Sequence, residues 1–121
     1  MEHALSAYYD ITHGEGLAII TPRWMRHILS EKTLPRFVKY GVNVFGIDAS
    51  LPPCEIAEKA IQATHDFFVS IGIPMTLREV GIDESRIDEM AHHVTENDAL
   101  ANTWVPLKQE DVAAIFRASL A

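Results

Sequence analysis

The sequence predicts an all-α protein, and three observations support this prediction. Apolar residues recur at intervals of three and four along the longest expected helix, which places them on one helical face. Several segments begin with residues that are typical of helix N-termini. No segment alternates apolar and polar residues over several positions, as a half-buried strand would. We therefore expect a compact bundle of five to seven helices, forming a single domain over residues 1–121.

Composition excludes several classes of protein. Hydrophobic residues make up 48 % of the chain and charged residues 22 %, which is typical of a folded globular domain. The net charge of −7 argues against nucleic acid or an anionic membrane as the main partner. No apolar run approaches the roughly 20 residues that a membrane span needs. The first residues include Glu2 and His3 and do not resemble a signal peptide, and Cys54 is the only cysteine, so we expect a cytoplasmic protein.

The first long helix is expected to begin at residue 13. Thr12 and Glu15 have the spacing of a capping box, in which each side chain bonds the backbone N–H of the other residue. Pro22 leaves two alternatives open beyond this point. The segment 13–30 is either one kinked helix, or two abutting helices of which the second has Thr21 as its N-cap.

The clearest helix in the sequence follows a shorter one over residues 35–44. Pro52 and Pro53 precede it, and Gly72 and Pro74 end it in the usual order. One face of this helix carries an apolar stripe. The stripe consists of Ile56, Ala60, Ala63, Phe67 and Ile71.

Start signals also mark the remaining helices. Thr76 and Glu79 form a second capping box for one short turn, and Asp83 caps the next helix. Leu107 and Val112 have the spacing of a hydrophobic staple at the start of the last helix. We expect eight residues from three of these helices to form the core. They are Ile56, Ala60, Phe67, Ile87, Met90, Val94, Ile115 and Phe116.

Four of the six histidines are expected to be surface residues. His92 and His93 are adjacent on a helix, where neighbouring side chains point about 100° apart and cannot converge on one ion. His27 follows a basic run and His65 precedes an acidic residue, which is typical of solvated positions.

His13 occupies a more unusual position. It begins a helix, where the aligned peptide dipoles favour the neutral imidazole that binds metals. Gly14 and Gly16 are costly in a helix, so some steric or functional compensation is expected, such as close approach of a ligand. A lone histidine does not make a metal site. The residues alone therefore leave two interpretations open, an exposed histidine at a capped helix start or one ligand of an incomplete site.

The segment EHALSAYYDITHGEGLAIITPRWM (2–25) resembles the signature segment of the iron-containing (group III) alcohol dehydrogenases, particularly the butanol-dehydrogenase-like branch. The similarity continues through YGVNVFGID, FFVSIGIPMTLREVGID and PLKQEDVAAIF, and so covers essentially the whole chain. The resemblance implies the C-terminal helical domain that these enzymes share with the dehydroquinate synthase-like fold.

In such enzymes a divalent metal (Fe or Zn), held by one aspartate and three histidines, lies between this domain and an N-terminal domain that binds NAD(P). The resemblance implies that His13 is a metal ligand. It implies that His3 is a catalytic residue near the nicotinamide and substrate, where it helps to move a proton. The other ligands and the pyrophosphate loop would lie upstream of Met1. The chain thus corresponds to the C-terminal third of a longer enzyme without its nucleotide-binding domain, and alone it should hold neither metal nor NAD(P) tightly.

Two functions agree best with these observations. The first is the metal- and substrate-binding part of an alcohol dehydrogenase, inactive alone, and the second is a stand-alone helical structural or interaction module without catalysis. A weaker third hypothesis is a metal-binding module that uses His92 and His93. The first implies a missing N-terminal partner domain, so we expect an exposed apolar face near the N-terminus, with Leu5, Tyr8 and Tyr9, through which the chain self-associates.

Overall fold

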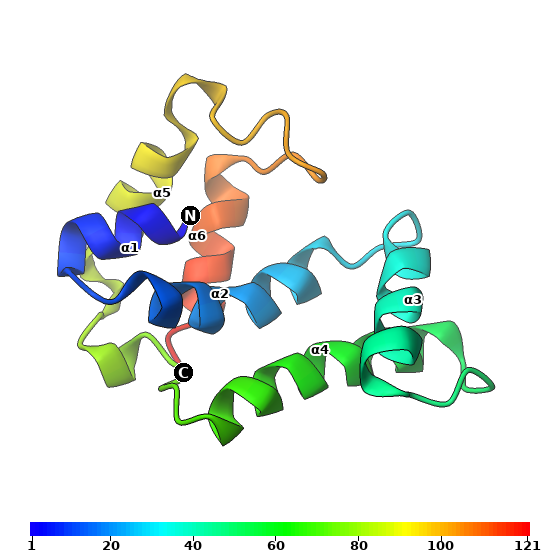
Figure 1. Ribbon diagram of the computed structural model, residues 1–121. Coiled ribbons are helices and arrows are strands. Elements are labelled where there is room, and N and C mark those ends of the chain that lie inside the picture. The colour runs from blue at the N-terminus through cyan, green and yellow to red at the C-terminus, as the bar shows by residue number, and fades with distance from the viewer.

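The computed structural model describes all residues, 1–121, and contains only helices (Figure 1). Its six α-helices are α1 (Glu2–Tyr9), α2 (His13–Ile28), α3 (Leu34–Phe45), α4 (Pro53–Ser70), α5 (Ile87–Thr95) and α6 (Gln109–Ala118). Three short 3-10 turns join them, at η1 (Arg78–Val80), η2 (Glu84–Arg86) and η3 (Glu96–Asp98). The predicted all-α fold is confirmed. None of these helices combines the length and hydropathy that crossing a membrane requires.

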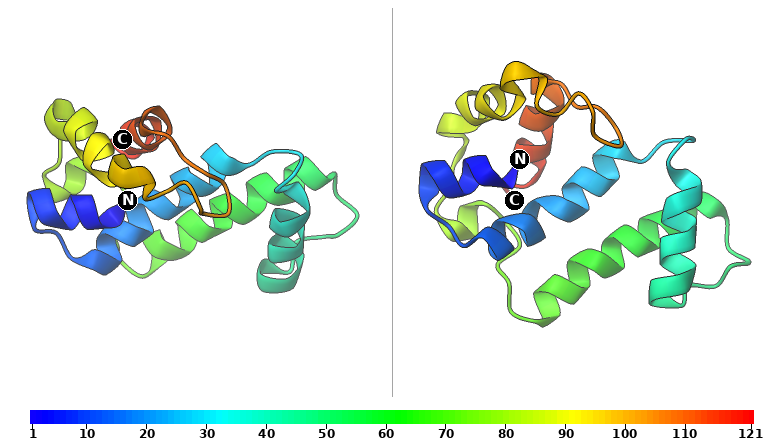
Figure 2. Two further views of the ribbon diagram at one scale, coloured as in Figure 1. Left: turned by 90° about the horizontal axis from the view of Figure 1, so that it is seen from above. Right: turned by 45° about the horizontal axis from the view of Figure 1, so that its top comes forward.

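Helix α2 lies at the centre of the arrangement and packs against α1, α4 and α6. Helix α3 crosses α4 at one end of the molecule, whereas α1 and α5 lie at the other end (Figures 1 and 2). Helix α1 also packs against α5, which in turn packs against α6. The N-terminal end of α2 is therefore enclosed on one side by α1, which places residues 2 and 13 next to each other.

Six of the eight predicted core residues are buried. They are Ile56, Ala60, Ile87, Met90, Ile115 and Phe116. Val94 is only half-buried at the edge of the core, and the prediction for Phe67 is wrong, because its side chain is 54 % exposed. Phe67 and Ile71 do lie on the same face of the helix as Ile56, but that face is open to solvent at the C-terminal end of α4.

The expectation of an exposed Leu5 is also wrong. Leu5 is fully buried, and Tyr8 and Tyr9 are half-buried against the core, because α1 lies against both α2 and α5. The apolar side chains that do remain exposed lie elsewhere. They are Leu17, Val44, Phe67, Val69, Ile71 and Trp104.

Helix α2 begins where the sequence predicts, but it lacks the predicted side-chain cap. The helix begins at His13, yet the Thr12 side chain makes no capping hydrogen bond. Pro22 lies inside one continuous helix, which decides between the two alternatives. The Thr21 hydroxyl donates to the Leu17 carbonyl, one turn earlier, at 2.6 Å. It thus bonds a backbone oxygen next to the position where Pro22 lacks a backbone N–H to donate.

The start signals of the later helices are confirmed in part: Thr76 bonds Glu79 without the reciprocal bond of a capping box, and Asp83 caps η2, whereas α5 itself begins after Arg86 without a side-chain cap. Thr76 and Glu79 bond each other through the threonine hydroxyl, at 2.7 Å to the carboxylate and 3.2 Å to the backbone N–H. The Asp83 carboxylate accepts a backbone N–H two residues on, at 2.9 Å, just before η2. Leu107 and Val112 are both buried at the start of α6, as a hydrophobic staple requires.

Candidate metal centre

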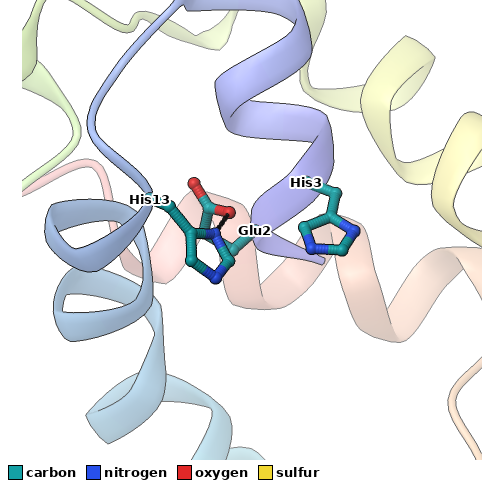
Figure 3. A group of neighbouring side chains, drawn as sticks. All are labelled: Glu2, His3 and His13. Carbon is teal, nitrogen blue, oxygen red and sulfur yellow. Dashed lines mark hydrogen bonds and ion pairs between the residues drawn. The ribbon is translucent and has the colours of Figure 1, made fainter.

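Helices α1 and α2 bring three potential metal ligands together at the N-terminal end of α2. Asp10 ends α1 in the left-handed backbone conformation, with φ of 52°, and the chain then turns back into α2. As a result the His13 ring lies beside Glu2 and His3 (Figure 3), and the ring centroids of the two histidines are 5.4 Å apart. The ligand atoms of all three side chains lie within 4.8 Å of one another.

Glu2 is buried although it carries a carboxylate. Its side chain is only 2 % exposed, whereas that of His13 is 55 % exposed. One carboxylate oxygen, Oε2, contacts Nδ1 of His13, and the other, Oε1, accepts a hydrogen bond from the Ser6 hydroxyl. Burying a carboxylate is costly unless it is hydrogen-bonded, and here both oxygens have a partner.

The two glycines of α2 have different surroundings. A Cβ atom on Gly16 would lie 2.5 Å from Oε1 of Glu2, 2.6 Å from its Cγ and 2.9 Å from its Cδ. A Cβ atom on Gly14 would meet nothing within 4 Å. The sequence predicted that a close contact would compensate for the cost of these glycines. That contact is found at Gly16, where the missing side chain leaves room for Glu2 rather than for a ligand.

The donor set fits a divalent transition metal. Imidazole and carboxylate groups are ligands of Zn²⁺ and Fe²⁺, and a complete site needs three or four of them. Since both oxygens of Glu2 are already bonded and the side chain is buried, the groups that face solvent and remain free to ligate are His3 and His13. These two histidines could therefore supply part of a metal site.

The other histidines form no comparable cluster. His92 and His93 are 66 % and 55 % exposed, as expected, and each approaches Glu96, at 3.5 and 3.7 Å. His27 contacts a carboxylate of α6 at 3.0 Å, and His65 is 3.4 Å from the carboxylate of the next residue. Nowhere else in the chain do three such groups bring their ligand atoms together as Glu2, His3 and His13 do.

Known proteins share both this sequence and this fold. The family model described as "Fe-containing alcohol dehydrogenase family, C-terminal" matches residues 1–120. The chain belongs to this family. The family was expected from the resemblance of the histidine-containing segment, and its match extends over all six helices.

Relatives of this iron-containing alcohol dehydrogenase chain are considerably longer. The NADH-dependent butanol dehydrogenase A of Clostridium acetobutylicum is 51 % identical over 120 residues, which are 98 % of this chain and 31 % of that protein. The 1,3-propanediol dehydrogenase of Klebsiella pneumoniae is 34 % identical over 97 % of this chain and 30 % of its own length. The chain thus spans less than a third of the length of the curated relatives it matches.

A solved relative has the same fold. The crystal structure of NADH-dependent butanol dehydrogenase A from Thermotoga maritima superposes with a TM-score of 0.86 at 31 % identity. The superposition covers 99 % of this chain and 31 % of that one. The predicted C-terminal helical domain of an iron-containing alcohol dehydrogenase is therefore confirmed as a fold.

The structure brings together His3 and His13, the two predicted site residues, and adds Glu2, which the sequence did not single out. A glutamate near the N-terminus is normally a solvated residue, so nothing about Glu2 itself pointed to the site. The available signal was Gly16, whose cost inside a helix required a compensating close contact. That signal indicated a close contact at position 16 but did not identify Glu2 as the residue that makes it.

Proposed function

We propose that this chain is the metal- and substrate-binding helical part of an NAD(P)-dependent alcohol dehydrogenase, which interconverts a small alcohol and an aldehyde by hydride transfer. The observation that carries the proposal is the environment of His13. The ring begins α2, is half exposed, and contacts a buried carboxylate through Nδ1, which leaves Nε2 available to a metal. Membership of the iron-containing alcohol dehydrogenase family supports the same role.

His13 would supply one ligand to the divalent metal (Fe or Zn) through Nε2. When bound, such a metal acts as a Lewis acid that polarises the substrate oxygen. His3 lies next to His13 on the exposed side of α1, and in the complete enzyme it would accept or return a proton at the substrate oxygen. Glu2 does not face solvent and takes no direct part in the reaction.

The partner required by this function is an N-terminal nucleotide-binding domain, as expected for a chain that matches only 31 % of its relative from C. acetobutylicum. No glycine-rich loop in this sequence would hold the pyrophosphate of NAD(P). Self-association is a second prediction. With Leu5 buried, the apolar surface available for it is the end of α4, with Phe67, Val69 and Ile71. The lone, exposed Cys54 supports a cytoplasmic location.

The test is to join this chain to the N-terminal two thirds of the C. acetobutylicum butanol dehydrogenase. We expect metal-dependent oxidation of butanol by the joined protein and no measurable turnover by the 121-residue chain alone. In the joined protein, His13→Ala should abolish metal retention, measured by elemental analysis after gel filtration. His3→Ala should lower kcat and leave the metal content unchanged.

Three results would contradict this proposal. Robust butanol oxidation by the chain alone would show that no partner domain is needed. A well-folded joined protein that lacks activity would favour the alternative of a helical structural or interaction module without catalysis. A joined protein that retains its metal after His13→Ala would overturn the assignment of His13 as a ligand.

A further inference from the structure

We propose that Glu2 is a positioning residue, whose buried carboxylate holds the His13 ring by Nδ1 and so presents an unprotonated Nε2 to the metal. The inference rests on the proposed function in one respect, namely that His13 is a metal ligand. Neither the family match nor the sequence singled out Glu2, and its proposed role differs from that of a metal ligand.

Glu2 and His13 differ sharply in burial. The Glu2 side chain is 2 % exposed and that of His13 is 55 % exposed, so the pair spans the boundary between the protein interior and solvent. The carboxylate cannot turn towards a solvent-side metal without losing its contacts to His13 and Ser6. Glu2 is therefore placed behind the ligand rather than among the ligands.

The contact with Glu2 also determines which ring nitrogen of His13 carries the proton. A neutral histidine ring carries one N–H, and a carboxylate can only accept a hydrogen bond. The contact between Glu2 and Nδ1 therefore places the proton on Nδ1 and leaves the lone pair on Nε2, which points away from Glu2 (Figure 3). Metal-binding histidines commonly donate their other N–H to a carboxylate in this way, which fixes the ring and strengthens it as a ligand.

The residues around Glu2 fit its side chain closely. Ser6 lies one turn along α1 and donates its hydroxyl to the carboxylate oxygen that His13 does not contact. Gly16 lies about one turn along α2, and any side chain there would occupy the space of that carboxylate. Two helices are thus shaped around one buried charge, which is a costly arrangement for a group with no function.

The experiment measures the tautomer of His13 in the ¹⁵N-labelled 121-residue chain, from the chemical shifts of its two ring nitrogens at a pH where the ring is neutral. In the unmodified chain we expect the Nδ1–H form to predominate. Glu2→Ala should lower the ratio of Nδ1–H to Nε2–H by about tenfold or more, since a hydrogen bond to a charged group contributes at least that much. Glu2→Gln should give an intermediate ratio, because its amide oxygen still accepts a hydrogen bond. Glu15→Gln, which removes a neighbouring carboxylate without a hydrogen bond to His13, should leave the ratio unchanged.

A second variant protects the test against loss of folding in Glu2→Ala. Gly16→Ala keeps Glu2 in the chain but displaces its carboxylate, so it should lower the tautomer ratio as Glu2→Ala does, whereas Gly14→Ala should not. Titration with Zn²⁺, followed by the His13 ring signals, should show roughly tenfold weaker binding for Gly16→Ala than for Gly14→Ala.

The results that would contradict the role of Glu2 differ from those that would contradict the proposed function. If Glu2→Ala and Gly16→Ala leave the tautomer ratio unchanged, or leave Zn²⁺ binding unchanged, Glu2 does not position His13, even in an active joined enzyme. If the ratio and Zn²⁺ binding change as expected but the joined protein retains its metal after His13→Ala, the positioning contact stands and the metal-ligand assignment falls.

Discussion

Replacing the two glycines of α2 by alanine should have opposite effects on stability. A glycine inside a helix is about 1 kcal/mol less favourable than alanine, so Gly→Ala normally stabilises a helix wherever the added methyl group has room. At Gly14 the new Cβ has nothing within 4 Å. At Gly16 it would meet three atoms of Glu2 at 2.5–2.9 Å, which is too close for any of them to remain in place.

The magnitudes follow from these surroundings. Gly14→Ala should raise the free energy of unfolding by about 0.5–1 kcal/mol. Gly16→Ala has the same intrinsic gain, but Glu2 must leave its position and lose its hydrogen bonds to Ser6 and His13. One hydrogen bond to a charged group contributes about 1.5–3 kcal/mol, and we take one as the net loss because the displaced carboxylate is rehydrated. Gly16→Ala should therefore be roughly 1.5–3 kcal/mol less stable than Gly14→Ala.

Urea unfolding, followed by circular dichroism at 222 nm, measures this difference, provided that the variants share one m-value. The Glu2→Ala background supplies the control, because without the Glu2 side chain the new methyl group has room. There, Gly16→Ala should stabilise the protein as much as Gly14→Ala does, and the difference between backgrounds is the coupling energy. Equal stability of Gly14→Ala and Gly16→Ala, or an equal effect of Gly16→Ala in both backgrounds, would refute the reasoning.

Two further predictions concern the core and the start of α6. Leu5→Ala should lower the free energy of unfolding by about 2.7–5 kcal/mol, because it leaves a cavity in the core. Phe67→Ala, at a largely exposed site, should lower it by about 1 kcal/mol or less. Equal losses in urea unfolding would contradict the buried position of α1. The backbone N–H of Lys108 donates to Asp111 at 2.9 Å and holds the pKa of that carboxyl below its usual value, so the contact stabilises the folded state above about pH 4 and is lost as the pH falls further. Asp111→Ala should cost about 1 kcal/mol at pH 7, with a difference that shrinks below pH 4, and a loss that is constant with pH would contradict this account.

The features that were predicted correctly depend on short stretches of sequence. Asp83 and the pair Thr76 and Glu79 bond groups two or three residues away, so their roles can be inferred without knowing the fold. The buried faces of α5 and α6 follow from helical periodicity, because these two helices pack against each other.

The features that were missed depend on contacts between helices. Periodicity indicated the apolar face of α4 correctly, but not that this face is uncovered at Phe67. Leu5 was expected to contact a missing domain, whereas α2 and α5 of the chain itself cover it. Glu2 belongs to the candidate site only because α1 folds back onto α2, and no local pattern contains that information.

The close fit between Glu2 and Gly16 also restricts how a sequence with this site can evolve. A side chain at position 16 is destabilising while a glutamate occupies position 2, and a shorter residue at position 2 removes that cost. Replacements in descendants of this chain are therefore expected first at position 2 and then at position 16. Position 16 lies about one turn from His13 on α2. Substitution there becomes favourable only after the Glu2 carboxylate, which contacts His13, has been lost.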